Sequence, residues 1–257
     1  MTTTIVEYYD DLILNESYAE FFGSDYANYG YWNEDIENLK QAGDNMMKML
    51  LSPSTGKEKR ILDVACGKGE STAYLAAKYS PESIAAINIS KNQVEHVRAK
   101  VPGADVRVMD AAELEYPDNH FDGVICVEAA FHFQTRQRFF SSAHRVLKPG
   151  GWISLADILL SREAEAGRRF RVAENFVPDL PAYEEGMKQA GFVNTTVQDV
   201  TEPCFHGLFR YMVHYFHERF LEKKIDLDTV KNRLRSIYGH AEDLRYYLLA
   251  SGMKPGV

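Results

Sequence analysis

The sequence predicts an α/β fold, in which helices cover both faces of a doubly wound, mostly parallel seven-stranded sheet. From Lys59 onward, short and nearly uninterrupted apolar segments alternate with amphipathic segments, a pattern typical of parallel strands buried on both faces. A glycine-containing turn joins the first apolar segment to a helix, as in many α/β ligand sites. Right-handed crossovers between consecutive parallel strands then make the sheet doubly wound.

The individual elements follow from the same pattern and from the Gly and Pro residues between segments. The expected strands of the first part span residues 60–65, 84–89, 104–109, 121–127 and 151–157. The expected helices between them span residues 70–79, 91–101 and 136–147. Later segments predict a helix over 181–190, a strand over 192–200, two helices over 205–242 and a closing strand over 244–250.

The order of these elements predicts one core with two helical additions. We expect a helical N-terminal lid over residues 1–57 and an α/β core over residues 58–202. A helical cap insertion over residues 203–243 and the closing strand of the core over residues 244–257 complete the chain. Helices placed just before a last strand form a cap on the core and not a separate domain.

Composition and charge limit the functions that are open to the chain. Its 257 residues are 45% apolar and carry a formal net charge of −8, so the surface repels phosphate backbones. The three cysteines form no C-x-x-C pair, which fits a reducing compartment and offers no zinc framework. The sequence starts without the features of a signal peptide, and no apolar stretch approaches the length of a spanning helix. We therefore expect a cytoplasmic protein with no nucleic-acid or membrane partner.

The glycine-containing turn reads Asp-Val-Ala-Cys-Gly-Lys-Gly-Glu over residues 63–70. Gly67 and Gly69 permit positive φ angles and let a ligand approach the backbone closely. Thr72 stands where a dinucleotide fingerprint has its third glycine. Glu70 follows Gly69 where a P-loop has lysine, and its charge disfavours a phosphate at the helix start. The turn therefore suits a ligand that is not a polyanion.

This turn resembles motif I of the class I S-adenosylmethionine-dependent methyltransferases, in the form Asp63-x-x-Cys66-Gly67-x-Gly69. Further landmarks of that family follow at the ends of the next strands and before the fifth strand: Asn88, Asp110-Ala111 and Leu147-Lys-Pro-Gly-Gly151. The flanking segments, 28–32 and 190–201, resemble methyltransferases of natural products, ubiquinone precursors and tocopherols. The resemblance implies a Rossmann-like fold with S-adenosyl-L-methionine as the cofactor.

The resemblance also implies a set of residues that contact the cofactor: Asp63, Cys66, Gly67, Gly69, Asn88, Ile89, Gln93, Asp110, Ala111, Glu128 and Tyr29. In this set, the glycines pass the methionine part of the cofactor, and Asp110 accepts from the adenine amine. Asn88 meets the ribose hydroxyls, although most family members have Asp or Glu there, so its hydrogen bonds lack charge assistance. Alternatives remain open, because Asn88 is also typical of a strand-end turn and Asp110 of a helix N-cap.

The expected reaction transfers a sulfonium methyl group in line to a nucleophile inside a dry pocket. His132 follows the fourth strand and is the expected general base, because a histidine there serves related O-methyltransferases and titrates near neutrality. The alternative is a histidine bonded to a backbone carbonyl. Glu128 either receives the methionine ammonium or orients the site, and a purely structural carboxylate is the alternative.

Aromatic side chains are the expected walls of the substrate pocket, since ring faces tolerate positive charge. The candidates are Tyr8, Tyr31, Trp32, Phe131, Phe209 and Tyr215. The alternative is that the N-terminal rings hold the lid on the sheet and that Phe209 and Tyr215 form the core of the cap. An arginine-rich segment over residues 161–171 predicts a solvated face, or else a site for an anionic substrate.

These observations predict methyl transfer to a small, largely apolar or aromatic molecule, at an oxygen atom with His132 as the base. A C-methyltransferase acting on an isoprenoid or aromatic ring is the first alternative. The second is a methyltransferase-fold cyclase or binding protein that transfers no methyl group. The sequence indicates no metal site, and it leaves a homo-oligomer open.

Overall fold

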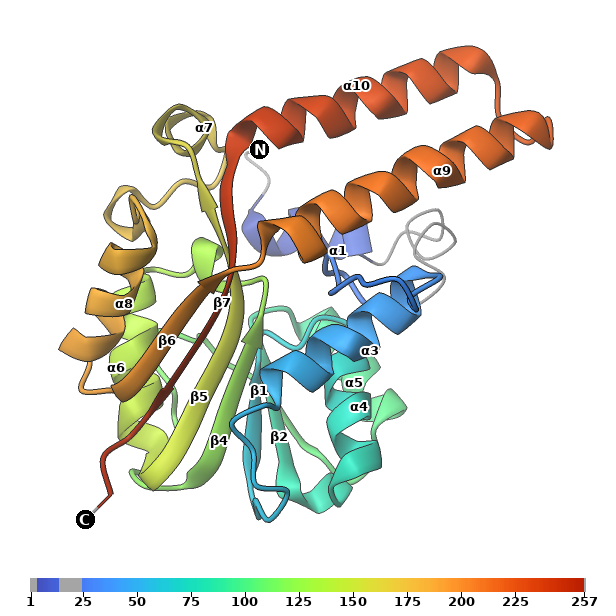
Figure 1. Ribbon diagram of the computed structural model, residues 1–257. Coiled ribbons are helices and arrows are strands. Elements are labelled where there is room, and N and C mark those ends of the chain that lie inside the picture. The colour runs from blue at the N-terminus through green and yellow to red at the C-terminus, as the bar shows by residue number, and fades with distance from the viewer. Residues whose placement is uncertain (1–3, 14–24, 257) are drawn as a thin grey trace.

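The computed structural model describes residues 4–13 and 25–256, so part of the expected N-terminal lid lies outside the described residues. The described chain forms a seven-stranded sheet in the order β3-β2-β1-β4-β5-β7-β6. Strand β7 is antiparallel to both of its neighbours, and the other strands pair in parallel. This arrangement confirms the predicted fold class (Figure 1).

The strands and helices lie close to their predicted positions. The strands are β1 (Ile61–Val64), β2 (Ile84–Asn88), β3 (Asp105–Val108), β4 (Phe121–Val127), β5 (Leu147–Leu160), β6 (Val193–Asp199) and β7 (Leu244–Met253). The α-helices are α1 (Ile5–Ile13), α3 (Leu39–Leu50), α4 (Glu70–Lys78), α5 (Lys91–Lys100), α6 (Arg136–Val146), α7 (Arg162–Gly167), α8 (Leu180–Gln189), α9 (Gly207–Leu221) and α10 (Leu227–Asp243). Short 3-10 turns follow α4, β4 and α7, and a π-helical segment, Glu202–His206, precedes α9.

Side-chain caps set the start of several helices. Asn38, Ser90, Thr135 and Asp179 each accept a hydrogen bond from a backbone N–H in the first turn of α3, α5, α6 and α8, respectively. The cap at Asn38 sets the start of α3 at Leu39. None of the described helices combines the length and apolar character needed to cross a lipid bilayer.

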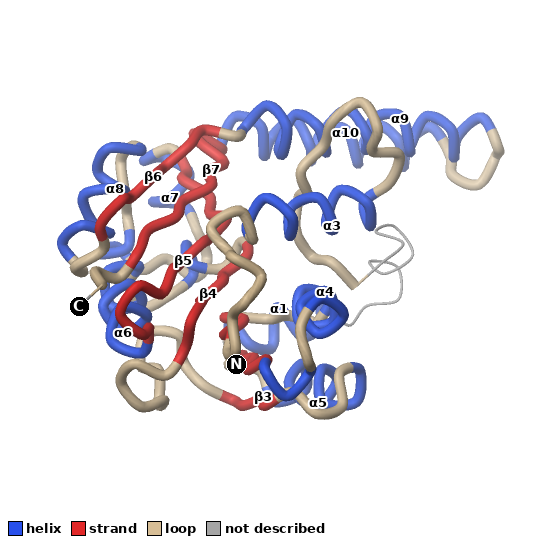
Figure 2. Tube along the Cα trace, turned by 60° about the horizontal axis from the view of Figure 1, so that its bottom comes forward, coloured by secondary structure: helices blue, strands red, loops and turns tan. Residues whose placement is uncertain are grey.

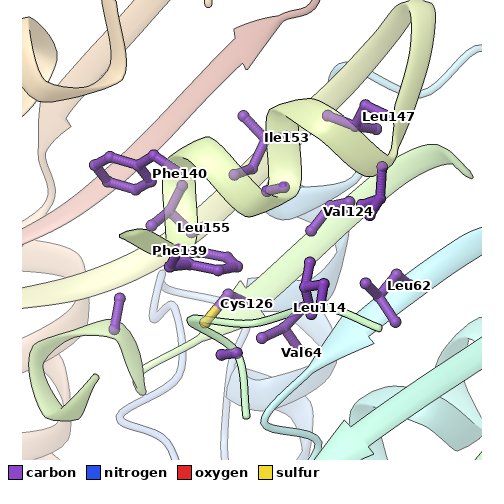
Figure 3. Close-up of a cluster of buried hydrophobic side chains, with 14 of the residues drawn as sticks. Leu62, Val64, Leu114, Val124, Cys126, Phe139, Phe140, Leu147, Ile153 and Leu155 are labelled. Atoms are coloured by element: carbon purple, nitrogen blue, oxygen red, sulfur yellow. The ribbon is translucent and has the colours of Figure 1, made fainter. Parts of the chain in front are cut away.

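The sheet carries helices on both faces (Figure 2). Side chains of β1 alternate between them, so Leu62 joins the cluster beneath α6 and α8 while Ile61 joins the cluster beneath α3 and α4. Figure 3 shows part of the first cluster, in which Phe139 and Phe140 of α6 lie against apolar side chains of β4 and β5. The strands β1 and β2 are buried along their whole length, as the apolar sequence pattern predicts.

A buried ion pair joins the first turn of α6 to the sheet. Asp157 of β5 has no exposed surface and accepts from Nε of Arg136 at 2.7 Å and from the hydroxyl of Tyr183 at 2.9 Å. Nη1 of Arg136 also donates to the backbone oxygen of Asn175. The side chains of Arg136, Asp157 and Tyr183 are all buried, and their hydrogen bonds fix α6, α8 and β5 relative to one another.

The helices α9 and α10 lie between β6 and β7 in the chain and extend past the sheet as an antiparallel pair (Figure 1). The strand β5 is longer than the expected 151–157 at both ends, because Leu147 pairs with Phe121 of β4 and β7 pairs with β5 as far as Leu160. The cap helices begin at the π-helical segment, three residues before the expected start.

Candidate functional site

A cavity of about 270 Å³ lies at the carboxyl ends of the parallel strands, and residues of α1 line one side of it. Apolar side chains form much of its wall, and polar groups from the strand ends project into it. Its lining comes from α1, the glycine turn and the ends of β2, β3 and β4: Ile5, Val6, Tyr9, Ala27, Ala65, Gly67, Ile87, Asn88, Ile89, Ser90, Gln93, Met109, Asp110, Ala111, Val127, Glu128, Ala129, His132, Phe133 and Gln134. This is where open parallel sheets bind ligands.

The glycine turn brings bare backbone to the cavity. Gly67 has a φ of +53° and lines the cavity, and a Cβ built on it would meet no atom within 4 Å. Gly69 has a φ of +81° and starts α4, but a Cβ there would come within 2.8 Å of Val97. Gly69 therefore serves close packing against α5, whereas Gly67 leaves room for a ligand. Cys66 is buried beside them and does not line the cavity.

Asp63 lies behind the turn, with 1% of its surface exposed. The hydroxyls of Ser71 and Thr72 both donate to its Oδ2 at 2.7 Å. Its Oδ1 is buried and has no hydrogen-bond partner among the described residues. Burial raises the pKa of this carboxyl to about 6, against the effect of the two hydroxyl donors. A buried carboxylate with an unused oxygen favours a cation or a hydrogen-bond donor near the turn.

The ends of β2 and β3 form the other side of the cavity. Asn88 is buried, its Nδ2 donates to Oε1 of Gln93 at 3.0 Å, and its Oδ1 accepts from the backbone N–H of Ser90 at 2.9 Å. Asp110 is exposed and accepts from the backbone N–H of Ala112 at 2.8 Å. With Ile89 and Ala111, these side chains bring the predicted nucleoside-binding residues to one wall of one cavity.

Glu128 follows β4 in the left-handed backbone region, with a φ of +49°. Its Oε1 accepts from the backbone N–H of Tyr29 and from the hydroxyl of Tyr247, both at 2.5 Å. Burial raises the pKa of this carboxyl to about 8, although both donors lower it. Tyr29 thus contacts Glu128 through its backbone N–H, while its ring stacks on Tyr247 and does not line the cavity.

His132 lies in the 3-10 turn Ala130–His132, with each ring nitrogen paired. Nη2 of Arg168 donates to Nδ1 at 2.8 Å, and the hydroxyl of Tyr9 pairs with Nε2. Because a guanidinium only donates, Nδ1 is the acceptor, and the proton of the neutral ring is assigned to Nε2. Burial and the charges of Arg168 and Arg136 lower the pKa of His132 to about 3. The imidazole is therefore neutral in this arrangement.

The six aromatic side chains predicted for the substrate pocket lie outside the lining of this cavity. Trp32 packs against Gly207 of α9 and against the ring of Tyr211. Phe131 lies next to His132 and beneath the guanidinium of Arg168. Phe209 contacts Tyr238 of α10. The remaining three lie at other places: Tyr8 is exposed on α1, Tyr31 is half-buried beside α3, and Tyr215 packs within α9.

Three residues of α1, Ile5, Val6 and Tyr9, line the cavity, and the predicted set of site residues contains none of them. Their spacing, i, i+1 and i+4, is the only signal, and it describes a helix face and not the surface that this face covers. The Arg168 contact with His132 was also missed, because the arginine-rich segment has the composition of a solvated surface.

The residues present fit S-adenosylmethionine, whose amino-acid part carries an ammonium and whose other part is a nucleoside. Gly67 leaves open space at the turn, and the unpaired oxygen of Asp63 favours a cation or donor there. Glu128 offers a second carboxyl group on the cavity wall. Asn88, Gln93 and Asp110 would hold the nucleoside at the opposite wall.

Comparisons with known proteins show which family the chain resembles in sequence. A family model described as a methyltransferase domain matches residues 62–155. An O-methyltransferase of Penicillium expansum is 32% identical over 215 residues, covering 78% of this chain and 76% of that protein. The 27-O-demethylrifamycin SV methyltransferase of Amycolatopsis mediterranei is 33% identical, covering 68% of this chain and 69% of that protein.

Among solved structures, the cyclase SpnF superimposes with a TM-score of 0.74 at 21% identity, covering 100% of this chain and 97% of that protein. This likeness concerns the fold alone. Sequence similarity over most of both chains, together with the glycine turn and the strand-end residues around one cavity, decides the family. The chain belongs to the S-adenosylmethionine-dependent methyltransferases.

Proposed function

We propose that this methyltransferase methylates an oxygen atom of a small, largely apolar or aromatic natural product. The observation that carries the proposal is the pair formed by Tyr9 and His132, in which a phenolic hydroxyl reaches Nε2 of His132 at the cavity. A phenol attached to an apolar scaffold is the kind of acceptor that such a position accommodates. The names of the two O-methylating relatives support the same choice of atom.

In the proposed reaction His132 is the general base. When bound, S-adenosylmethionine supplies an electrophilic methyl group, and the acceptor oxygen forms the new O–CH₃ bond as the S–CH₃ bond breaks. The acceptor hydroxyl takes the place of the Tyr9 hydroxyl at Nε2 and gives its proton to the ring. Apolar lining residues such as Val127 and Phe133 keep water from competing with the acceptor.

This role sets a condition on Arg168. As long as Arg168 donates to Nδ1, the ring proton stays on Nε2, and that nitrogen has no lone pair for an acceptor proton. When Arg168 releases Nδ1, the ring proton can move to Nδ1, and the lone pair of Nε2 becomes available to the acceptor proton. This release also removes one of the positive charges that lower the pKa of His132. We therefore expect Arg168, at the C-cap of α7, to change its contact with His132 during the reaction.

The test is His132→Ala, assayed by mass spectrometry with phenolic and with carbon acceptors. Loss of a general base lowers the rate of O-methylation about 100- to 10,000-fold. His217→Ala, on the exposed side of α9, is the control and keeps wild-type activity. Unchanged O-methylation in His132→Ala would contradict the role of the base. Methylation at carbon only, or an isomerised product without mass gain, would support the C-methylating or the non-transferring alternative.

A further inference from the structure

Asp10 of α1 reaches across to the first turn of α5, beside the cavity. Its Oδ1 accepts from the hydroxyl of Ser90 at 2.6 Å and from Nε2 of Gln93 at 3.0 Å. Its Oδ2 accepts from Nδ2 of Asn92 at 2.8 Å. Ser90 and Gln93 both line the cavity, next to Asn88. Asp10 is not itself a lining residue, but its carboxylate is hydrogen-bonded to two lining residues at the wall where a nucleoside sugar is expected.

The end of β2 by itself is short of hydrogen-bond acceptors. A ribose brings two hydroxyl donors, which a carboxylate about 20 residues after the glycine turn accepts in dinucleotide-binding folds. This chain has the neutral Asn88 at that place, and its Oδ1 already accepts from Ser90. Oε1 of Gln93 already accepts from Asn88. Neither oxygen is therefore fully available to a sugar hydroxyl.

Asp10 can accept a further hydrogen bond, whereas the side-chain oxygens of Asn88 and Gln93 are already used. A carboxylate offers about four lone-pair positions, and three protein donors use three of them. Hydrogen bonds to an ionised acceptor are also stronger than those to an amide oxygen. The N-terminus of α5 adds a favourable dipole for a negative charge at this point.

We propose that Asp10 accepts a ribose hydroxyl of the bound cofactor and so replaces, from α1, a carboxylate at the end of β2. Its neighbour Tyr9 meets His132 at the other end of the cavity, so α1 spans both parts of the site. The cofactor then binds the arrangement with α1 in place more tightly than one with α1 away. Cofactor binding therefore stabilises α1 in its position over the cavity.

Calorimetry with S-adenosylhomocysteine and its two monodeoxyribose analogues tests this contact without any acceptor, so the result is independent of the proposed O-methylation. For Asp10→Asn we expect affinity for S-adenosylhomocysteine to fall about 10- to 100-fold, as for loss of a charged hydrogen bond. One of the two deoxy analogues lacks the hydroxyl that Asp10 accepts. For that analogue, the affinities of the wild type and of this variant are expected to lie within about threefold of each other. Asp11→Asn makes the same charge change on exposed α1 surface and is the control, with unchanged affinity.

A second variant separates the contact from the positioning of α1. In Asp10→Asn combined with Asn88→Asp, the carboxylate returns at the end of β2, and we expect affinity to recover to within about threefold of wild type. Equal weakening for all three ligands would mean that Asp10 only holds α1, and it would overturn the proposal. Unchanged affinity in Asp10→Asn, or no recovery in the double variant, would overturn it as well.

Discussion

The guanidinium of Arg168 donates to Nδ1 of His132 and ties α7 to the turn after β4. The same guanidinium donates to the backbone oxygen of Phe131 at 3.0 Å and pairs with Glu165 at 3.0 Å. Arg168 is mostly buried, so solvent screens its charge only weakly from the imidazole. Arg168 therefore sets the tautomer of His132 and adds to the effect of burial in lowering the pKa of the imidazole.

Arg168→Gln is expected to raise the pKa of His132, because burial remains but one nearby positive charge is removed. In the wild type the imidazole is neutral above about pH 3. In the variant the acid limb of the kcat/KM profile moves to higher pH, since protonated His132 cannot act as a base. The profile is measured with one phenolic acceptor. Arg162→Gln, at the start of α7 and above the ring of Phe176, is the control. Superimposable acid limbs in Arg168→Gln and wild type would contradict this coupling.

Tyr9→Phe is expected to lower KM for a phenolic acceptor about 2- to 10-fold, because the hydroxyl that competes for Nε2 of His132 is removed. The ring and its apolar contacts stay, so affinity for S-adenosylhomocysteine changes little. Steady-state kinetics with separate kcat and KM values measure the effect. Tyr8→Phe, on the exposed side of α1, is the matched control. A large fall in kcat instead would show that the Tyr9 hydroxyl takes part in the chemistry.

Glu128→Gln is expected to remove a pH dependence of cofactor binding. Burial raises the pKa of this carboxyl to about 8, so it is mostly protonated at neutral pH and ionises as the pH rises. Affinity for the cationic cofactor should therefore increase through about pH 8 in the wild type and not in the variant. Both proteins share the titration of the cofactor's own amino group, so the difference between them isolates Glu128. Parallel curves from calorimetry would place Glu128 away from the cofactor's charge.

The same shift predicts how stability varies with pH. The folded state holds the proton of Glu128 more tightly than the unfolded state, so this group's contribution to stability falls as the pH rises from about 4.5 to 8. Glu128→Gln removes this loss. Relative to wild type, the variant should melt at a higher temperature at pH 8 than at pH 5, as measured without ligand. An equal difference at both pH values would contradict the raised pKa.

Gly67→Ala is expected to weaken binding of S-adenosylhomocysteine at least 10-fold, because its methyl group enters the open space at the turn. A positive φ in a residue other than glycine also costs about 1 kcal/mol of stability. Gly150→Ala is the matched control, with a φ of +76° and equally open surroundings but no place in the cavity lining. Both variants should lose similar stability in urea unfolding, and only Gly67→Ala should lose affinity. Equal affinity in the two would remove Gly67 from the cofactor site.

Much of the cavity wall could be predicted, because its residues share one geometric property. Gly67, Asn88, Asp110 and Glu128 each lie at or just after the end of a parallel strand, and the carboxyl ends of neighbouring parallel strands meet at one edge. Their convergence therefore depends only on recognising the strands. The predicted aromatic walls had no such support, because a ring at helical spacing packs equally well between helices, as Phe209 does against Tyr238.

The sequence alone determined the order of strands and helices and the position of the glycine turn, since hydrophobic period and glycine conformation are properties of neighbouring residues. Only the tertiary structure decided that Asp10 contacts Ser90, that Arg168 contacts His132 and that β5 extends along β7. These pairings join elements that are far apart in the chain. Their geometry depends on how each helix or strand is oriented against the sheet, which no local pattern of residues specifies.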